Sequence, residues 1–189
     1  ILRQRTTALA VLGSLAAGTA MYGAAVFLTQ YFQLARGFSP TAAGLLTIPM
    51  MAGILVTSMV GGRLISRTGR IKPFLVTGSV LLTVGLGLLG LTGARTPLVL
   101  MCVAMLAVGA GIGLTMQNFV LVVQNSVPLR DIGTASSTIA FFRSLGGTIG
   151  VAVLGAVFAR RLDAHATADI AYGNATGTVF LISAAVAVL

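Results

Sequence analysis

The stretch Gly62-Arg-Leu-Ile-Ser-Arg-Thr-Gly-Arg-Ile-Lys-Pro73 is a short basic segment between two long apolar runs. It holds four of the twelve basic residues of the chain and no acidic residue. Each flanking run is long enough to cross a bilayer, whose hydrocarbon core of about 30 Å takes about 20 helical residues. A basic loop between two such runs is retained on the cytoplasmic side of a membrane. The segment therefore predicts a membrane protein and sets the orientation of the neighbouring spans.

The composition of the whole chain supports the same class. The 189 residues are 57% hydrophobic and 8% charged, with a mean hydropathy of +1.02. Soluble domains carry about 25% charged residues, so this chain lacks the polar surface to face water on all sides. We expect an all-α membrane protein, a six-transmembrane-helix bundle forming one domain over residues 1–189. Its spans are expected at about 6–35, 40–64, 73–92, 97–125, 132–160 and 175–189, and the chain is expected to be a fragment of a longer protein.

The distribution of charge predicts the topology. If the basic segment is cytoplasmic, alternation places the N-terminus and the loop near Arg130 on the same side. The cytoplasmic loops then hold seven basic residues and the outer loops four, which is the sign that the positive-inside rule requires. We expect a multi-pass protein of the cytoplasmic (plasma) membrane, embedded in the lipid bilayer. The basic residues are dispersed at span ends without aromatic interleaving, which argues against a nucleic-acid partner.

The sequence shows no constellation typical of an enzyme or a metal centre. The one histidine, His165, lies among small polar residues and has nothing to position it for proton transfer. The one cysteine, Cys102, lies inside an apolar run without a thiol, histidine or acid nearby. We therefore expect no catalytic residue, no metal site and no cofactor.

Polar residues inside the spans are more informative, because polar groups in hydrocarbon need partners or a water-filled cavity. A polar stripe in the first span follows helical spacing: Thr19, Tyr22, Thr29, Gln30 and Gln33. In the fourth span, Gln117 and Asn118 recur seven residues later as Gln124 and Asn125. Hydrogen bonding between helices suits the latter pair, near the membrane boundary. The candidates for lining a substrate cavity are Tyr22, Thr29, Gln30, Gln117 and Asn118, with interhelical hydrogen bonding as the open alternative.

Arg143 is a single basic residue within the fifth span. The apolar run from Leu145 to Ala159 is too short to cross the membrane, so the span must extend back past Arg143. The guanidinium then lies in the cytoplasmic part of the span, where it can snorkel or pair with a carbonyl or a carboxylate. The carboxylate would be Asp131 or a group outside this chain. A structural anchor and a gate or substrate contact both remain open roles.

The pattern Gly62-x-Leu64-x-Ser66-x-x-Gly69-Arg70-x-Lys72 resembles the conserved loop of the major facilitator superfamily, Gly-x-Leu-x-Asp-x-x-Gly-Arg-[Lys/Arg]-[Lys/Arg]. It departs from that loop at Ser66 and Ile71. Further matches are Phe38–Leu46 with Pro49, Gly109–Gly113 with Met116-Gln117, Val123–Pro128 with Arg130–Ala135, and Phe142–Gly147. Together these motifs resemble the C-terminal half of a fourteen-helix drug:proton antiporter of that superfamily.

The resemblance implies an export protein of two six-helix bundles that rock about a central site, with this chain as the C-terminal bundle. In that family the first and fourth helices of each bundle face the cavity, in agreement with the polar stripes. The implied partners are a small-molecule substrate and a missing N-terminal portion of six or eight helices. The implied energy source is the proton gradient, with the proton-carrying acid in the missing portion. The resemblance implies a gating or structural role for Gly62, Gly69 and Arg70. In the family, the Asp of this loop forms an ion pair with a basic residue, which Ser66 cannot form here.

The predicted function is proton-coupled efflux of hydrophobic or amphipathic drugs or toxic compounds across the cytoplasmic membrane. Two alternatives remain open. The same fold could move another small solute, such as a siderophore, a sugar or an amino acid. The chain could also be a non-transporting membrane scaffold or sensor, whose polar stripes only bind neighbouring helices.

Overall fold

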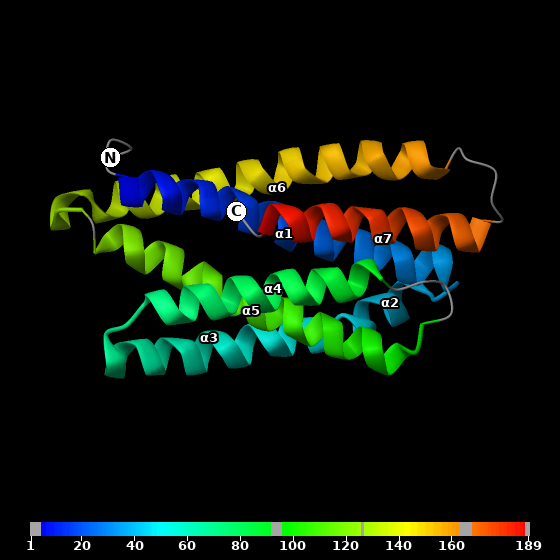
Figure 1. Ribbon diagram of the computed structural model, residues 1–189, viewed down its shortest axis with the longest axis horizontal. Coiled ribbons are helices and arrows are strands. Elements are labelled where there is room, and N and C mark those ends of the chain that lie inside the picture. The colour runs from blue at the N-terminus through cyan, green and yellow to red at the C-terminus, as the bar shows by residue number, and fades with distance from the viewer. Residues whose placement is uncertain (1–4, 92–95, 126, 163–167, 188–189) are drawn as a thin grey trace.

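The computed structural model describes residues 5–91, 96–125, 127–162 and 168–187, which form helices and short connections without a strand (Figure 1). In chain order these are α1 (Arg5–Gln30), its π-helical continuation η1 (Tyr31–Ala35), α2 (Pro40–Leu46), α3 (Ile48–Thr68), α4 (Lys72–Gly90), α5 (Leu98–Gln124), the 3₁₀ turn η2 (Leu129–Asp131), α6 (Ile132–Leu162) and α7 (Ala168–Ala187). The predicted all-α fold class is confirmed.

Five stretches are long and apolar enough to cross a membrane: Leu9–Ala35, Pro40–Thr68, Lys72–Gly90, Leu98–Gln124 and Leu129–Arg160. A sixth apolar stretch, Ala175–Ala185, is shorter within the described residues. The start of α1, the α3–α4 turn and the α5–α6 connection lie at one end of the bundle in Figure 1. These are the three places that the sequence assigned to one side of the membrane.

The second span, expected as one helix, is divided into α2 and α3 at Thr47. The Thr47 hydroxyl donates to the Gly44 carbonyl at 2.6 Å, and the break lies two residues before Pro49. Proline lacks an N–H, and its ring disfavours a helical conformation in the preceding residue. The start of α2 is capped by Ser39, whose Oγ accepts from the Ala42 N–H at 3.3 Å. The bend expected at Pro49 therefore takes the form of a break two residues earlier.

The basic segment Gly62–Pro73 is mostly helical rather than a loop. Helix α3 continues to Thr68 and α4 begins at Lys72, so three residues form the turn between them. Gly69 ends α3 in the left-handed region at φ +66°, and its N–H donates to the Ile65 carbonyl at 2.8 Å. A residue without a Cβ is favoured at this position of a helix terminus. The glycine therefore sets where the helix stops.

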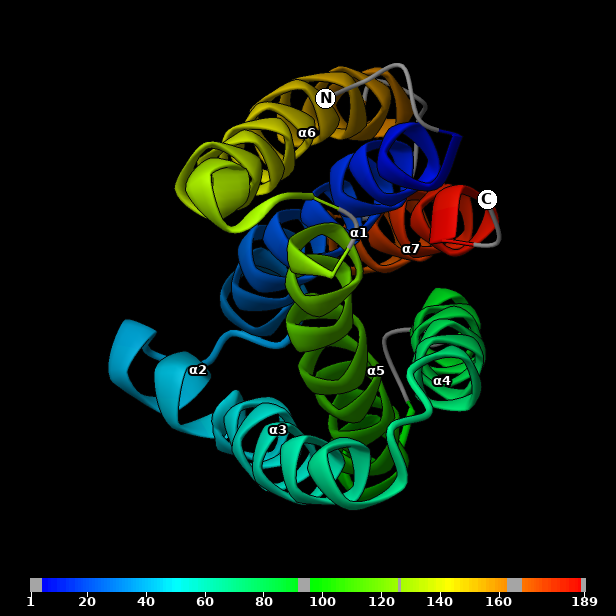
Figure 2. The same ribbon diagram turned by 90° about the vertical axis from the view of Figure 1, so that its left-hand side faces the viewer.

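Helices α1 and α5 are central, and the others surround them. The most apolar windows of α1 and α5 are each 56% buried, against 17% for α2–α3 and 28% for both α4 and α6. Viewed along the bundle in Figure 2, α6 and α7 lie beside α1, while α3 and α4 lie beside α5. The outer helices expose large apolar side chains such as Leu55, Val56 and Met59 on α3. In a membrane protein these side chains face lipid.

Glycines and small hydroxylated residues form the closest helix crossings. At the α1–α6 crossing, a Cβ on Gly18 or Gly146 would overlap the backbone of the other helix. The hydroxyl of Thr19 donates across the same crossing to the Gly146 carbonyl at 2.9 Å. At the α3–α5 crossing, a Cβ on Gly53 would lie 2.6 Å from the Leu106 carbonyl oxygen. Such close approach gains van der Waals contacts that lipid does not supply.

Candidate functional site

The candidate cavity residues lie on the two central helices. In Figure 2, α3 and α6 flank α1 and α5, while α4 and α7 cover the opposite side. We call the surface of α1 and α5 between α3 and α6 the open face. Two candidate residues on these central helices are exposed. Tyr22 on α1 is 39% exposed, and its ring packs against Gly147 of α6, while Gln117 on α5 is also exposed.

Two other candidates place amide oxygens in the interior. Asn118 is fully buried, and its Nδ2 donates to the Leu114 carbonyl at 2.6 Å. Its Oδ1 is buried and accepts no hydrogen bond from the described residues, and the same holds for Oε1 of Gln30. A buried acceptor left unpaired costs about 1–3 kcal/mol. Thr29, the fifth candidate, is half-buried and donates to the Ala25 carbonyl of its own helix at 2.9 Å.

Some polar residues of the two stripes bind neighbouring helices instead. Thr19 is buried and bonded to α6, as described above. Gln124 near the end of α5 donates from Nε2 to the Ser136 hydroxyl of α6 at 2.9 Å. Interhelical hydrogen bonding, one of the two interpretations of the stripes, therefore describes these two residues.

Arg143 lies on α6 beside α5. Its side chain is half-buried, and Nη1 donates to the Met116 sulfur at 3.4 Å. The contact joins α6, which borders the open face, to α5, one of the two helices that form it (Figure 2). The structure thus brings Arg143 and Met116 from distant parts of the sequence into contact.

The basic segment lies apart from this region, at the end of the bundle. Gly62 and Arg70 are exposed, and a Cβ on Gly62 would meet no atom within 4 Å. Ser66 donates to the Arg63 carbonyl at 2.9 Å within its own helix. Gly69 has the clearest structural function, since it ends α3.

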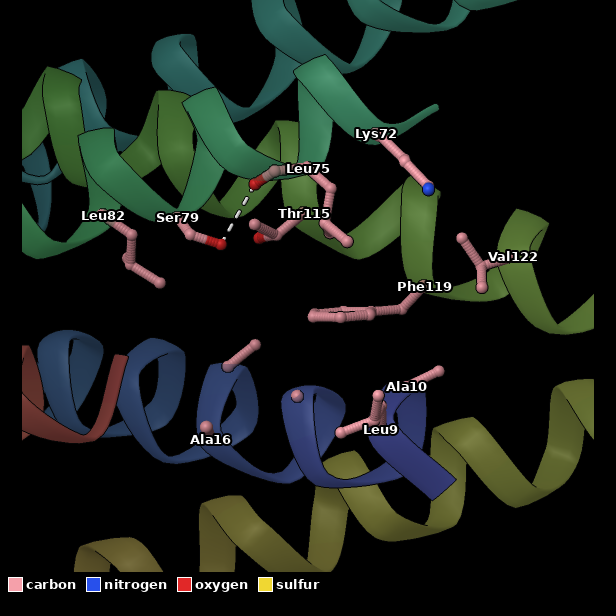
Figure 3. A pocket seen from close by; sticks show the side chains of 12 residues that line it. Leu9, Ala10, Ala16, Lys72, Leu75, Ser79, Leu82, Thr115, Phe119 and Val122 are labelled. Carbon is pink, nitrogen blue, oxygen red and sulfur yellow. Dashed lines mark hydrogen bonds between the residues drawn. The ribbon is translucent and has the colours of Figure 1, made fainter. Parts of the chain in front are cut away.

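A cavity of about 460 Å³ lies between α1, α4 and α5 and was not indicated by the sequence. Small residues of α1 form one wall, and the Phe119 ring extends between α4 and α1 (Figure 3). None of the five candidate residues lines the cavity. Its polar lining groups Ser79 and Thr115 donate to carbonyls of their own helices, at 3.0 and 2.8 Å. Lys72 lies at its edge, and α1 and α4 are also the helices against which α7 packs.

This cavity suits an apolar occupant, because its hydroxyl groups are already bonded. Its wall on α1 includes the small residues Ala10, Gly13, Ala16 and Ala17, which repeat at helical spacing. That spacing equally describes a close helix contact, so it does not distinguish a cavity from packing.

Comparison with known proteins supplies the family. The sequence matches the profile of the Major Facilitator Superfamily over residues 1–151. The chain belongs to this superfamily. The match includes every motif on which the resemblance was based, from the Phe38–Leu46 stretch to Phe142–Gly147.

Several members of the superfamily are similar to this chain. An uncharacterised MFS-type transporter of Mycobacterium tuberculosis is 43% identical over 150 residues, 79% of this chain and 22% of the relative. The multidrug transporter protein MdtP of Bacillus subtilis is 36% identical over 141 residues, 75% of this chain and 26% of the relative. A tetracycline resistance determinant of Streptomyces rimosus is 35% identical over 137 residues, 72% of this chain and 40% of the relative. The matched region thus covers between 22% and 40% of these relatives.

Proposed function

We propose that this chain forms one six-helix bundle of an exporter that expels hydrophobic or amphipathic compounds across the cytoplasmic membrane. The open face of α1 and α5 is the observation that carries the proposal. The phenol of Tyr22 and the amide of Gln117 are exposed on these two helices, which are the most buried of the bundle. Exposed polar groups on central membrane helices are typical of a face that lines a water-accessible pathway.

The chemistry of this face suits amphipathic compounds. An aromatic ring such as Tyr22 binds apolar surface and attracts cations through its π-face. The amide of Gln117 donates and accepts hydrogen bonds. Similar chains named for multidrug transport and tetracycline resistance support the same class of substrate. An enzymatic function is disfavoured, since superfamily membership and the open face both favour transport rather than a reaction.

The same proposal includes proton coupling and a second bundle. The sequence contains three acids, Asp131, Asp163 and Asp169, and none lies within an apolar run. A carboxylate that carries protons through the membrane is therefore expected in the second bundle. Alternating access requires two bundles that enclose a midplane site.

Cysteine labelling of the intact transporter tests the open face. In a Cys102→Ala background, single cysteines replace Tyr22 and Gln117, and a water-soluble maleimide is added. We expect both positions to be labelled and to be protected by an exported compound. Cysteines at lipid-facing Leu55 and at buried Thr19 are the matched controls, and neither should react. Equal labelling at all four positions, or none at Tyr22 and Gln117, would contradict the proposed pathway.

Efflux measurements test the activity itself. Cells that produce the intact transporter are expected to export a fluorescent lipophilic cation, and a protonophore is expected to abolish that export. If producing cells retain as much cationic and neutral dye as cells without the protein, the result would favour transport of another solute or a scaffold function.

A further inference from the structure

We propose that Arg143 forms an ion pair with a carboxylate side chain of the second bundle, across the interface where the two bundles of the transporter meet. This inference rests on the proposed two-bundle exporter. It is carried by the Arg143 guanidinium, by its depth in the membrane and by the positions of the acids of this chain.

The guanidinium is under-satisfied within the described part of the chain. A guanidinium carries five N–H donors. The hydrogen bond that Arg143 makes there goes from Nη1 to the Met116 sulfur, and a thioether is a weak acceptor. The remaining donors match the two oxygens of a carboxylate, which a guanidinium binds in a bidentate manner.

The position of Arg143 makes full hydration by bulk water difficult. Helix α6 has 31 residues and is about 46 Å long at 1.5 Å per residue. If its excess over a hydrocarbon core of about 30 Å is shared equally, about 8 Å protrudes at each end. Arg143 follows the first residue, Ile132, by about 16 Å of helix rise. The residue therefore lies about 8 Å inside the hydrocarbon layer, where an arginine needs a partner.

Among the described side chains, no acid lies beside Arg143. Asp131 lies at the end of the bundle, where its Oδ2 is 3.7 Å from Nε of Arg130. Asp163 and Asp169 follow α6, whose last residue, Leu162, lies about 28 Å beyond Arg143 along the helix. A carboxylate that pairs with Arg143 would therefore come from outside this chain.

The side on which the guanidinium lies favours the second bundle as the source. Arg143 reaches from α6 to Met116 of α5, so its guanidinium lies between a helix that borders the open face and a helix that forms it, and the second bundle is proposed to meet this face. An exporter of cationic amphipathic compounds also requires this charge to be neutralised, because a bare guanidinium would repel its substrates. A protein carboxylate satisfies both requirements.

Charge reversal with second-site suppression tests the pair in the intact transporter. Arg143→Glu is expected to lower efflux at least tenfold, since two carboxylates would then face each other. Arg130→Glu, at the exposed end of the bundle, is the control and should change efflux less than twofold. Suppressors of Arg143→Glu, selected by mutagenesis of the remainder of the gene, should replace one acid outside residues 1–189 with a neutral or basic residue and restore efflux to within threefold.

Oxidative cross-linking tests the contact without requiring transport. Cysteines at position 143 and at each membrane-embedded acid of the second bundle are expected to form one disulfide pair in the absence of substrate. Unchanged efflux by Arg143→Met, or suppressors confined to residues 1–189, would overturn the ion pair. Loss of export by Arg143→Met for anionic compounds alone would assign the guanidinium to the substrate instead. If no compound is exported, a cross-link still supports the pair, and its absence at every acid overturns it.

Discussion

Gln117 and Asn118 are adjacent in sequence and chemically alike, yet the fold gives them opposite surroundings. Gln117 is exposed, whereas Asn118 is fully buried and its Oδ1 accepts no hydrogen bond from the part of the chain that the structure describes. Successive residues of a helix differ by about 100° in direction, so one is exposed while the other turns toward packed neighbours. The same substitution should therefore have different effects at the two positions.

Gln117→Glu should leave the amount of folded intact transporter close to that of the wild type and change its export of cationic compounds. Asn118→Glu should lower the folded amount severalfold, because an unpaired buried charge is strongly unfavourable. Size-exclusion chromatography of fluorescently tagged protein measures the folded amount, and dye efflux measures the export. Equal folded amounts for both variants would show that Asn118 has access to water.

Thr19→Val should destabilise the bundle, because it removes the hydrogen bond from the Thr19 hydroxyl to the Gly146 carbonyl of α6. Bonds of this kind between membrane helices contribute about 0.6 kcal/mol on average and up to about 1.7 kcal/mol. Thr29→Val is the matched control, since its hydroxyl bonds within its own helix. Thermal unfolding in detergent should show the larger decrease for Thr19→Val, and the reverse order would disprove the assignment.

At the scale of the element, particular residues set where the helices begin and end and join the segments between them. Ser39 and Pro40 start α2, and Gly69 stops α3. At the opposite end of the bundle, Arg36 joins two segments: its guanidinium donates to the Tyr31 hydroxyl at 3.2 Å and to the Thr96 carbonyl. This contact ties the end of the first span to the residues that precede α5.

Two glycines of α6 should respond in opposite directions to a single added methyl group. Gly146→Ala should destabilise the bundle by about 1–3 kcal/mol, because its Cβ would overlap the Leu15 backbone of α1. Gly155→Ala meets no atom within 4 Å and should be neutral or stabilise the helix by up to about 1 kcal/mol. Unfolding of both variants in detergent checks this, and a comparable loss at Gly155 would place another helix against it.

At the scale of the whole molecule, the chain runs back and forth along the bundle, so its connections lie at two opposite ends. The α3–α4 turn and the α5–α6 connection share one end with the start of α1, and the α2 end of the bundle is opposite (Figure 1). The basic residues Arg63, Arg67 and Arg70 are exposed at the first of these ends. The positive-inside rule predicts that this end faces the cytoplasm.

Labelling in intact cells should establish the orientation. In the Cys102→Ala background, Ser39→Cys should react with a membrane-impermeant maleimide added outside, whereas Thr68→Cys should react only after the cells are opened. Both positions are exposed in the fold, so accessibility within the protein is matched. Labelling of Thr68→Cys in sealed cells would reverse the predicted orientation.

Much of the fold followed from the sequence because lipid leaves few choices. Apolar runs in a bilayer must be helical, since their backbone groups have no water to bind. Proline and glycine then marked the ends, although the helical extension of α3 into the basic segment was missed. The sequence did not predict this extension, because Arg63 and Arg67 are compatible either with a loop or with a helix that continues out of the membrane.

The candidate site was only partly accessible to such reasoning. Helical spacing indicated polar stripes on the first and fourth spans but could not say what each residue faces, because that depends on the neighbouring helix. The hydrogen bond from Thr19 to the Gly146 carbonyl shows that Thr19 faces α6. The complete burial of Asn118 shows that this residue faces the packed interior. The cavity beside Phe119 depends on the spacing of three helices and has no local signature.

The sequence by itself determined the membrane class, the all-helical fold and the superfamily, because these depend on apolar run length, charge and local motifs. The tertiary structure alone decided which polar groups are exposed, which are paired across helices, and that Arg143 lies beside Met116. Those relations join residues that are distant along the chain. They arise from helix rotation and close packing, which no single stretch of sequence specifies.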